Sequence, residues 1–363
     1  MENDKRQYNE NISVVMPVYN TAVPFLKEAV DSILNQTFGD FEFIIIDDGS
    51  TNDAKEYLDG LTDPRIRIIR NETNIGITKS LNIGFKAAQG KYIARMDSDD
   101  VSFPERFEKQ YAFMEAHPDV IVCGTNIALF GGTVGARGQM VDDMDYYRAQ
   151  LLFYNPGPKH PTAFLNHELL DRYHITYNEK LKYAQDTGLW VDVSRFGRVV
   201  ILADILLKHR KHPAQISQMH RDEQFSSCHT ILKPLLTELL DTVTDEEIDL
   251  HLLHCSGYYC PDAVMTPEVA RWFHRIIRAN RKKRLYDQKH IERRIETITG
   301  WLLENTCKNE KSVIKKALLY LRYYPVLSVA IRKAKTRLLK ISFVKSMHDA
   351  LKNPKKNILK KRV

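Results

Sequence analysis

Three carboxylates follow a short apolar run in the first third of the chain. Asp97, Asp99 and Asp100 come directly after the strand-like segment from Lys91 to Arg95. Acids at the end of a strand can direct their oxygens at one point, and such hard ligands suit Mg²⁺ or Mn²⁺ carrying the phosphates of a substrate. Acids also stabilise a solvated turn or the first turn of a helix. The spacing therefore indicates either a metal–diphosphate site or a structural turn.

Two further strand-like segments end in polar residues. One closes on Asp47 and Asp48, and another closes on Tyr19 and Asn20. In a parallel sheet, ligands lie outside the carboxyl ends of the strands, so we expect these residues to converge on one crevice. The ring of Tyr19 can stack on a base there.

The elements that must position these residues alternate through the first 130 positions. An apolar helical stripe runs from Phe25 to Leu34, a strand is predicted over 65–70, and a helix over 75–89. Strand, helix and strand in succession indicate an α/β fold. The usual Gly-rich phosphate loops are missing from this region, which argues against a common dinucleotide fold and a P-loop enzyme. We therefore expect a metal to hold the phosphates.

Five ordered motifs resemble those of the family 2 glycosyltransferases, which have the GT-A fold. They are residues 17–20 (PVYN), 32–38 (SILNQTF), 47–50 (DDGS), 74–76 (NIG) and 97–100 (DSDD). Three later segments, 160–164 (HPTAF), 184–190 (AQDTGLW) and 206–212 (LLKHRKH), also resemble family signatures. The resemblance covers roughly residues 11 to 215. It implies an α/β nucleotide-diphospho-sugar transferase with a Rossmann-like mixed sheet.

The resemblance also implies a reaction and a nucleotide site. The family comprises inverting transferases that use a nucleotide-diphosphate sugar, most often a UDP-sugar, together with a divalent cation. In the family, a tyrosine packs on uracil and an acid hydrogen-bonds it, which implies these roles for Tyr19 and Asp48. Pro17 and Asn20 are implied to line the same pocket.

Metal and phosphate contacts follow from the same resemblance. Asp97 is implied to contact the donor ribose and the metal, and Asp99 to hold the metal most directly, whereas Asp100 has no definite role. Lys79 matches a position that often presents a basic group to the diphosphate, and it is equally typical of a solvated helix lysine. His212 matches a histidine that can approach the metal or the diphosphate, or it is a surface histidine in a basic turn.

Asp186 matches the family carboxylate that serves as the catalytic base. An inverting transfer needs a base within hydrogen-bond reach of the acceptor hydroxyl. An Asp before a predicted helix is also typical of an N-cap, so a structural role is the alternative. Gln185 departs from the family, where a Glu usually precedes this Asp. The change removes a negative charge that would raise the pKa of the base, which puts the acceptor geometry and the pH optimum in doubt.

Composition and charge suggest three parts. The 363 residues, of which 43% are hydrophobic, suffice for a large catalytic domain and an appendage. We expect a GT-A domain at 1–215, an α-helical extension at 216–310 and a basic amphipathic helical tail at 311–363. The tail has sixteen Lys and Arg residues against one acid, Asp349, whereas the whole chain carries +7. Such a tail suits peripheral contact with an anionic membrane, the alternative being a solvated helical face.

Composition and charge also restrict the cellular location and the binding partners that we expect. Five irregularly spaced cysteines suit a reducing compartment rather than a disulfide framework. We find no signal sequence and no apolar run long enough to span a bilayer, and expect a cytoplasmic protein, peripheral to the inner face of the membrane. A basic tail also suits nucleic acid, but a transferase that builds a lipid-carried glycan has more reason to meet a membrane, so no nucleic-acid partner is expected.

Three function classes are open at this stage. The preferred one is an inverting glycosyltransferase that moves a sugar to a saccharide or lipid-linked acceptor in cell-surface polysaccharide synthesis. The second is a catalytically degenerate sugar-nucleotide-binding partner of a glycan assembly, and the third is a nucleotidyltransferase. Intact Tyr19, Asp48, Asp99 and Asp186 favour the first over the second. A nucleotidyltransferase would be expected to have a Gly-rich, basic N-terminal loop, which is missing.

Overall fold

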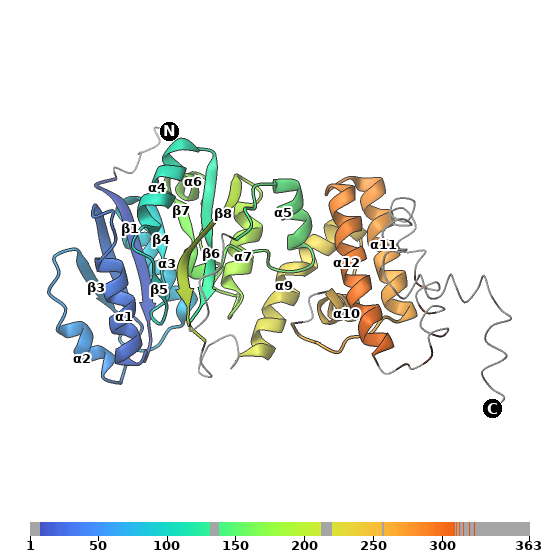
Figure 1. Cartoon of the computed structure of the whole chain (residues 1–363), viewed down its shortest axis with the longest axis horizontal. Helices are drawn as coiled ribbons and strands as arrows, with labels where there is room; N and C mark the ends of the chain where they lie inside the picture. Colours follow the sequence, from blue (N-terminus) through green and yellow to red (C-terminus); the bar gives the residue numbers. More distant parts are fainter. Residues whose placement is uncertain are drawn as a thin grey trace, which may run out of the picture.

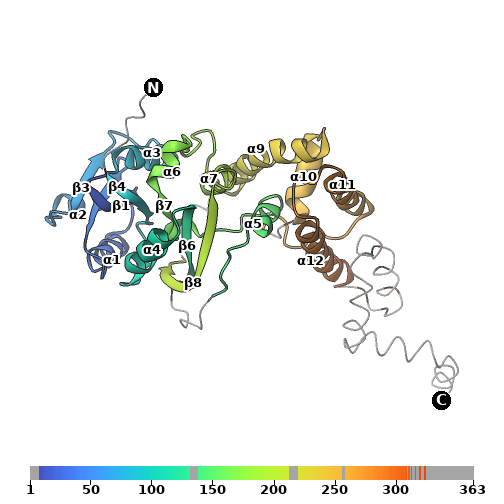
Figure 2. The ribbon, with the colours of Figure 1, turned by 90° about the horizontal axis from the view of Figure 1, so that it is seen from above.

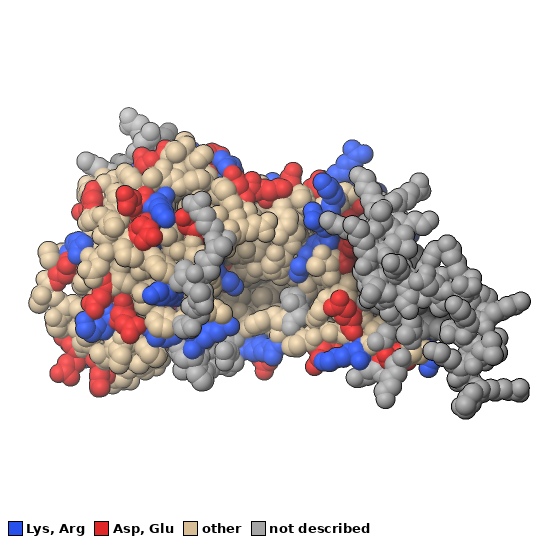
Figure 3. All heavy atoms as spheres, viewed as in Figure 1, with Lys and Arg blue, Asp and Glu red and all other residues tan. Residues whose placement is uncertain are grey.

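The computed structural model describes residues 8–130, 138–211, 220–255 and 258–308, and five single positions between 310 and 323. A part that contains the sheet and a part built from helices lie along the long axis of the molecule (Figure 1). On the face seen in Figure 3, the surface is hollowed between these two parts. His212, residues 131–137 and nearly all of the tail predicted at 311–363 lie outside the described residues.

Eight strands of the described residues form one sheet in the order β3-β2-β1-β4-β7-β6-β8-β5. Their bounds are β1 (Glu10–Val18), β2 (Phe41–Asp47), β3 (Ile66–Arg70), β4 (Gly90–Arg95), β5 (Val101–Ser102), β6 (Val120–Leu129), β7 (Phe164–Asn166) and β8 (Arg198–His209). Strands β3, β2, β1 and β4 are parallel neighbours, whereas β7 runs antiparallel to both β4 and β6. The predicted α/β class with a mixed sheet is confirmed.

Helices cover both faces of the sheet. They are α1 (Val23–Leu34), α2 (Ala54–Asp59), α3 (Ile77–Ala87), α4 (Arg106–Ala116), α5 (Met144–Leu151), α6 (His167–Arg172), α7 (Gln185–Val193) and the short 3₁₀ helix η1 (His160–Thr162). Successive strand residues point to opposite faces, so Val14 belongs to the core that includes residues of α1 and α4, while Val15 belongs to the core that includes residues of α3. Gly84 of α3 lies directly against Val15, where an added Cβ would come within 2.4 Å of its Cγ1. Glycine at this position therefore allows α3 to pack closely on β1.

Residues 220–308, where they are described, form helices and no strand. These are α9 (Arg221–Leu240), α10 (Asp245–Cys255), α11 (Pro267–Lys283) and α12 (Gln288–Cys307). Thr244 and Glu247 form the reciprocal hydrogen bonds of a capping box at the start of α10, as their spacing predicts. The apolar core of these helices continues into the core on the α3 face of the sheet. The three-part domain division is a prediction that the fold leaves open.

None of the described helices has the length and apolar character needed to cross a membrane.

Candidate active site

The parallel strands β1, β2 and β4 end at one edge of the sheet, and side chains join their ends. The backbone N–H of Asn20, after β1, donates to Ser50 Oγ at 3.0 Å, after β2. The hydroxyls of Thr21 and Ser98 lie 2.7 Å apart and connect β1 with the acidic loop after β4. The convergence expected from the sequence is therefore present, because parallel strands place their carboxyl ends together.

Asp48 is buried at the end of β2 and holds the turn that follows β3. Its carboxylate accepts hydrogen bonds from Asn71 Nδ2 at 2.7 Å and from the backbone N–H groups of Ile75 and Gly76 at 2.9 Å each. A carboxylate has about four acceptor positions, so one is left for a ligand. Gly49, with a φ of +74°, allows the close approach of this turn. Asn71 was not predicted as a site residue, although it begins a segment with turn chemistry.

The other predicted donor-binding residues lie around this edge. Tyr19 is 49% exposed, which leaves its ring accessible for stacking. Asn20 is exposed, has a φ of +50° and accepts a hydrogen bond from Thr51 N, while Pro17 is buried within β1. Lys79 is exposed on the first turn of α3, the helix that begins where the turn held by Asp48 ends.

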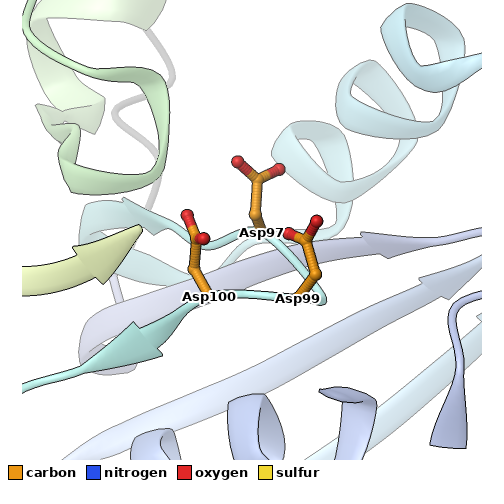
Figure 4. Close-up of side chains that lie close together, drawn as sticks. All are labelled: Asp97, Asp99 and Asp100. Carbon is orange, nitrogen blue, oxygen red and sulfur yellow. The ribbon is translucent and has the colours of Figure 1, made fainter. Parts of the chain in front are cut away.

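The acidic loop after β4 brings three carboxylates together. One oxygen from each of Asp97, Asp99 and Asp100 lies within 4.8 Å of the others. Figure 4 shows the three side chains projecting to the same side of the loop. Hard oxygen donors at this spacing fit a divalent cation such as Mn²⁺ or Mg²⁺. Asp97 and Asp99 are partly exposed and open to a ligand, whereas Asp100 is fully buried.

Asp100 connects the acidic loop to the end of β8. Its Oδ1 accepts from the backbone N–H of Arg210 at 2.8 Å, and its Oδ2 lies 3.1 Å from His209 Nδ1. Burial raises the pKa of Asp100 to about 6, and the hydrogen bond with Asp100 raises the pKa of His209. Both oxygens of Asp100 are thus engaged by the protein, which explains why its role was indefinite from the sequence.

Arg210, which directly follows β8, also contacts the acidic loop. Its Nε donates to the carbonyl of Asp99 at 2.8 Å and its Nη2 pairs with Glu28 at 2.5 Å. Its guanidinium lies over the rings of Phe25 and Phe130, at 4.2 and 3.7 Å from their centroids. The segment 206–212 predicts His212 as its site residue, whereas the contacts with the acidic loop come from His209 and Arg210, which were not predicted.

Arg95, the last residue of β4, was also missed. Its side chain is 2% exposed, its Nη2 pairs with Asp97, and its Nε and Nη1 have no hydrogen-bond partner among the described residues. Its positive charge lowers the pKa of Asp186. Arg95 therefore pairs with the acidic loop and also acts electrostatically on the predicted base.

Asp186 lies within the first turn of α7 and is partly buried. Ala184 is the N-cap of this helix, so the alternative in which Asp186 is the N-cap is wrong. Its Oδ1 accepts from Thr187 N at 2.7 Å and its Oδ2 from Asn155 Nδ2 at 2.9 Å. Burial raises the pKa of Asp186, and this effect is opposed by the hydrogen bond from Thr187 and the charge of Arg95. A carboxylate with a raised pKa is a suitable proton acceptor.

Gln185 is buried beside this carboxylate. Its Oε1 has no hydrogen-bond partner among the described residues. As a neutral amide, it does not add the like charge that a Glu would place next to Asp186. The raised pKa of Asp186 thus comes mainly from burial.

Comparison with known proteins places these features in a family context. The family model for glycosyl transferase family 2 matches residues 13–173. The chain is 31% identical over 244 residues to an uncharacterized glycosyltransferase of Haemophilus influenzae, a match that covers 64% of this chain and 75% of the relative. It is 29% identical over 207 residues to the amylovoran biosynthesis glycosyltransferase AmsE of Erwinia amylovora, covering 54% of this chain and 75% of AmsE.

A solved structure has a similar fold. Residues 1–349 of S. aureus TarS, solved in complex with UDP-GlcNAc, align with a TM-score of 0.56 and 18% sequence identity. The alignment covers 83% of this chain and 92% of the TarS chain.

Proposed function

The chain belongs to glycosyltransferase family 2 and has a GT-A-like fold, and on this premise we propose that it transfers a sugar from a UDP-sugar to a saccharide or lipid-linked acceptor with inversion at the anomeric carbon. The observation that carries the proposal is the convergence of Tyr19, Asp48 and the acidic loop at the carboxyl ends of the parallel strands. Arg95, which pairs with Asp97 of that loop, also acts electrostatically on Asp186. These groups supply what the reaction needs, which is a nucleotide site, a place for a cation and a base.

The nucleotide is proposed to bind between the ends of β1 and β2. Tyr19 stacks on the base, and the remaining acceptor position of Asp48 takes an N–H from uracil, with Pro17 and Asn20 lining the pocket. The accessible ring of Tyr19 and the three hydrogen bonds that orient Asp48 support this assignment. TarS, which shares the fold, has been solved with UDP as well as with UDP-GlcNAc.

Asp97 and Asp99 are proposed to hold Mn²⁺ or Mg²⁺. When bound, such an ion stabilises the negative charge that develops on the departing diphosphate. Asp97 also contacts the donor ribose in this proposal, while Asp100 supports the loop through its bonds to His209 and Arg210. Lys79 remains a proposed contact to the diphosphate from the exposed start of α3, and His212 remains a proposed contact to the metal or the diphosphate.

Asp186 is proposed to take the proton of the acceptor hydroxyl as that oxygen attacks the anomeric carbon from the face opposite the leaving group. It acts in its ionised form, which the hydrogen bonds from Thr187 and Asn155 favour. The hollow between the sheet-containing part and the helices is the proposed route by which the acceptor reaches it (Figure 3).

The cellular role is proposed to be polysaccharide synthesis, in line with the name of AmsE. We propose a catalytic domain over 1–215, a helical extension over 216–310 and a basic tail over 311–363 that holds the enzyme at an anionic membrane surface. The charge of the tail supports this last proposal, because each basic residue gains about 1 kcal/mol near an anionic leaflet.

One observation favours the alternative of a catalytically degenerate sugar-nucleotide-binding partner. Gln185 stands where the family usually has Glu, and its buried Oε1 has no partner in the part of the chain that the structure describes. Calorimetric titration of UDP, GDP and CDP with and without Mn²⁺, followed by product analysis with UDP-sugars, tests both functions. Metal-dependent UDP binding and a new glycosidic bond are expected. UDP binding without turnover would favour the degenerate partner, and released pyrophosphate would indicate a nucleotidyltransferase.

A further inference from the structure

We infer that helices α10, α11 and α12 act as a brace for the proposed base Asp186, with His251 as the main positioning residue. The inference rests on the proposed function, since it assigns a role to the helical extension in the same reaction. It begins from Asn155, the residue whose side chain holds the Asp186 carboxylate.

The amide of Asn155 is held in one orientation. Its Oδ1 accepts from the backbone N–H of Gly157 at 2.9 Å, so the Nδ2 faces the start of α7. The Nδ2 donates to Asp186 Oδ2 and to Thr187 Oγ1, both at 2.9 Å. The position of Asn155 therefore decides where the carboxylate lies and how strongly its ionised form is favoured.

The three residues before Asn155 are each held by the helical extension. The carbonyl of Leu152 accepts from His251 Nε2 at 2.7 Å, and the ring of Phe153 stacks on the His251 ring with centroids 5.4 Å apart. The guanidinium of Arg294, from α12, lies 4.3 Å from the ring centroid of Tyr154. Figure 2 shows α5, which leads into this segment, between the sheet-containing part and α10 to α12.

The third helix fixes the hydrogen position on His251. Trp272 Nε1, from α11, can only donate, and it lies 3.0 Å from His251 Nδ1, so that nitrogen is the acceptor. The hydrogen of the neutral ring is therefore on Nε2, where it donates to Leu152. Burial lowers the pKa of His251 to about 4, so the ring stays in this neutral form at neutral pH.

Together these contacts hold the Leu152 carbonyl and the rings of Phe153 and Tyr154. A base must be held within about half an ångström of its productive position, and small misplacements cost up to about a hundredfold in rate. The path from the Leu152 carbonyl to the Asn155 side chain is three residues along the backbone. A displacement at His251 is thus transmitted directly to the carboxylate of Asp186.

The pH dependence of turnover reports on this contact. Besides Asn155, the groups that act electrostatically on Asp186 are Arg95 from β4 and Lys159, which lower its pKa. Tyr147 of α5, Tyr177 and Cys228 of α9 interact with it as well. Because Asn155 favours the ionised carboxylate, its loss or displacement raises the pKa of Asp186. The acidic limb of the pH–rate profile, where activity falls as the base is protonated, then moves to higher pH.

The experiment compares His251→Leu, His251→Gln and Asn155→Ala in the full chain. The readout is UDP release from whichever of UDP-glucose, UDP-galactose and UDP-N-acetylglucosamine the unaltered enzyme turns over fastest, as a function of pH. We expect His251→Leu to lower kcat about tenfold or more and to leave the KM for the donor unchanged. We expect both His251→Leu and Asn155→Ala to move the acidic limb of the pH–rate profile to higher pH. His251→Gln retains an N–H donor and should recover part of both effects.

A matched control comes from the same helix. His254 makes its hydrogen bond within α10, to the carbonyl of Leu250, so His254→Leu should keep the original pH profile. Should His251→Leu fail to fold, Trp272→Phe removes the donor to Nδ1 and is expected to shift the limb in the same direction.

Two results would overturn the inference in distinguishable ways. If Asp186→Asn is inactive and Asn155→Ala shifts the limb while His251→Leu, or Trp272→Phe in its place, does not, the helices do not position the base. If Asp186→Asn retains full activity, the proposed base is wrong, and the helices cannot act by positioning it.

Discussion

Arg95 and Asp97 form an ion pair in which the guanidinium is buried at the end of β4 and the carboxylate is partly exposed. The same guanidinium lowers the pKa of Asp186. One buried cation therefore acts on two acids, one proposed to hold the metal and the other proposed to accept the proton. We expect metal binding at Asp97 and proton acceptance at Asp186 to be coupled electrostatically through Arg95.

Replacing Arg95 should change the pH dependence of turnover. In Arg95→Met the positive charge near Asp186 is lost, so the pKa of that carboxyl rises and the acidic limb of kcat moves to higher pH. A pH series of initial rates measures the shift. Arg172→Met removes an exposed cation that pairs with Glu168 and serves as the control. An unmoved limb in Arg95→Met would show that the charge is not felt at the base.

Asp186→Asn should abolish most of the turnover and leave nucleotide binding intact. The amide keeps the shape of the side chain but cannot take a proton, and the loss of a general base typically costs about 10²- to 10⁴-fold. Initial rates and UDP calorimetry on the same preparation separate the two effects. Weakened UDP binding in this variant would place Asp186 in the donor site instead.

The same variant should be more stable than the unaltered chain at neutral pH. Burial raises the pKa of Asp186 in the folded state, so the folded chain binds the proton more tightly than the unfolded chain does. Stability is therefore lost as pH rises from the unfolded value, about 3.9, through the raised folded value. An Asn never ionises and avoids this loss, which we expect to exceed the cost of the one hydrogen bond that its amide nitrogen cannot accept. Thermal unfolding at pH 7 should show a higher Tm, and an equal or lower Tm would contradict the burial argument.

Asp99 and Asp100 should separate into a metal ligand and a structural residue. Asp99→Ala should weaken Mn²⁺-dependent UDP binding about tenfold or more with little change in stability. Asp100→Ala leaves the backbone N–H of Arg210 without its partner and should cost about 1–3 kcal/mol of unfolding free energy. Calorimetry and urea unfolding of both variants check the assignment. If Asp99→Ala lost stability and Asp100→Ala lost metal-dependent UDP binding, the two roles would have to be exchanged.

Gly49→Ala should destabilise the fold and disturb the turn held by Asp48. The residue has a φ of +74°, and a Cβ there would lie 2.6 Å from the backbone carbon of Thr73. Such strain costs about 1–3 kcal/mol, which urea unfolding can measure. Gly39→Ala is the matched control, since its Cβ would meet nothing within 4 Å, and its effect should stay within about 0.5 kcal/mol. Equal effects would remove the case for a glycine requirement.

The basic tail should carry the membrane contact. The full chain is expected to sediment with anionic vesicles at low salt, and a chain truncated after Glu310 should not, because sixteen basic residues are removed. Neutral vesicles and high salt are the controls. If the two proteins sedimented equally, the contact would have to lie elsewhere or be absent.

Much of the catalytic fold could be read from local patterns. Apolar runs closing on Asp48 and on Asp97 predict buried strands, and the structure has β2 and β4 at these places. The acidic cluster was predictable because its members are neighbours in the chain. The capping box of Thr244 and Glu247 was predictable for the same reason, since a helix start depends on residues three apart.

The residues that were missed act through partners far along the chain. Arg210 lies 110 positions after Asp100, and Asn155 lies 31 before Asp186. His251 meets the Leu152 carbonyl across 99 positions. The local sequence around Asn155 and His251 does not differ from that of an ordinary surface or core position, and the family-like segment 206–212 does not itself show which of its residues contacts Asp100.

The sequence by itself thus determined the strand ends, the acidic loop, the family resemblance and the candidate base. Tertiary structure alone decided that Ala184 occupies the N-cap position of α7, that the buried Arg95 acts on two acids, and that three helices hold the segment before Asn155. The physical reason is that apolar periodicity and turn chemistry are local properties of a chain. The pKa and orientation of a buried carboxylate depend instead on which distant groups the fold packs around it.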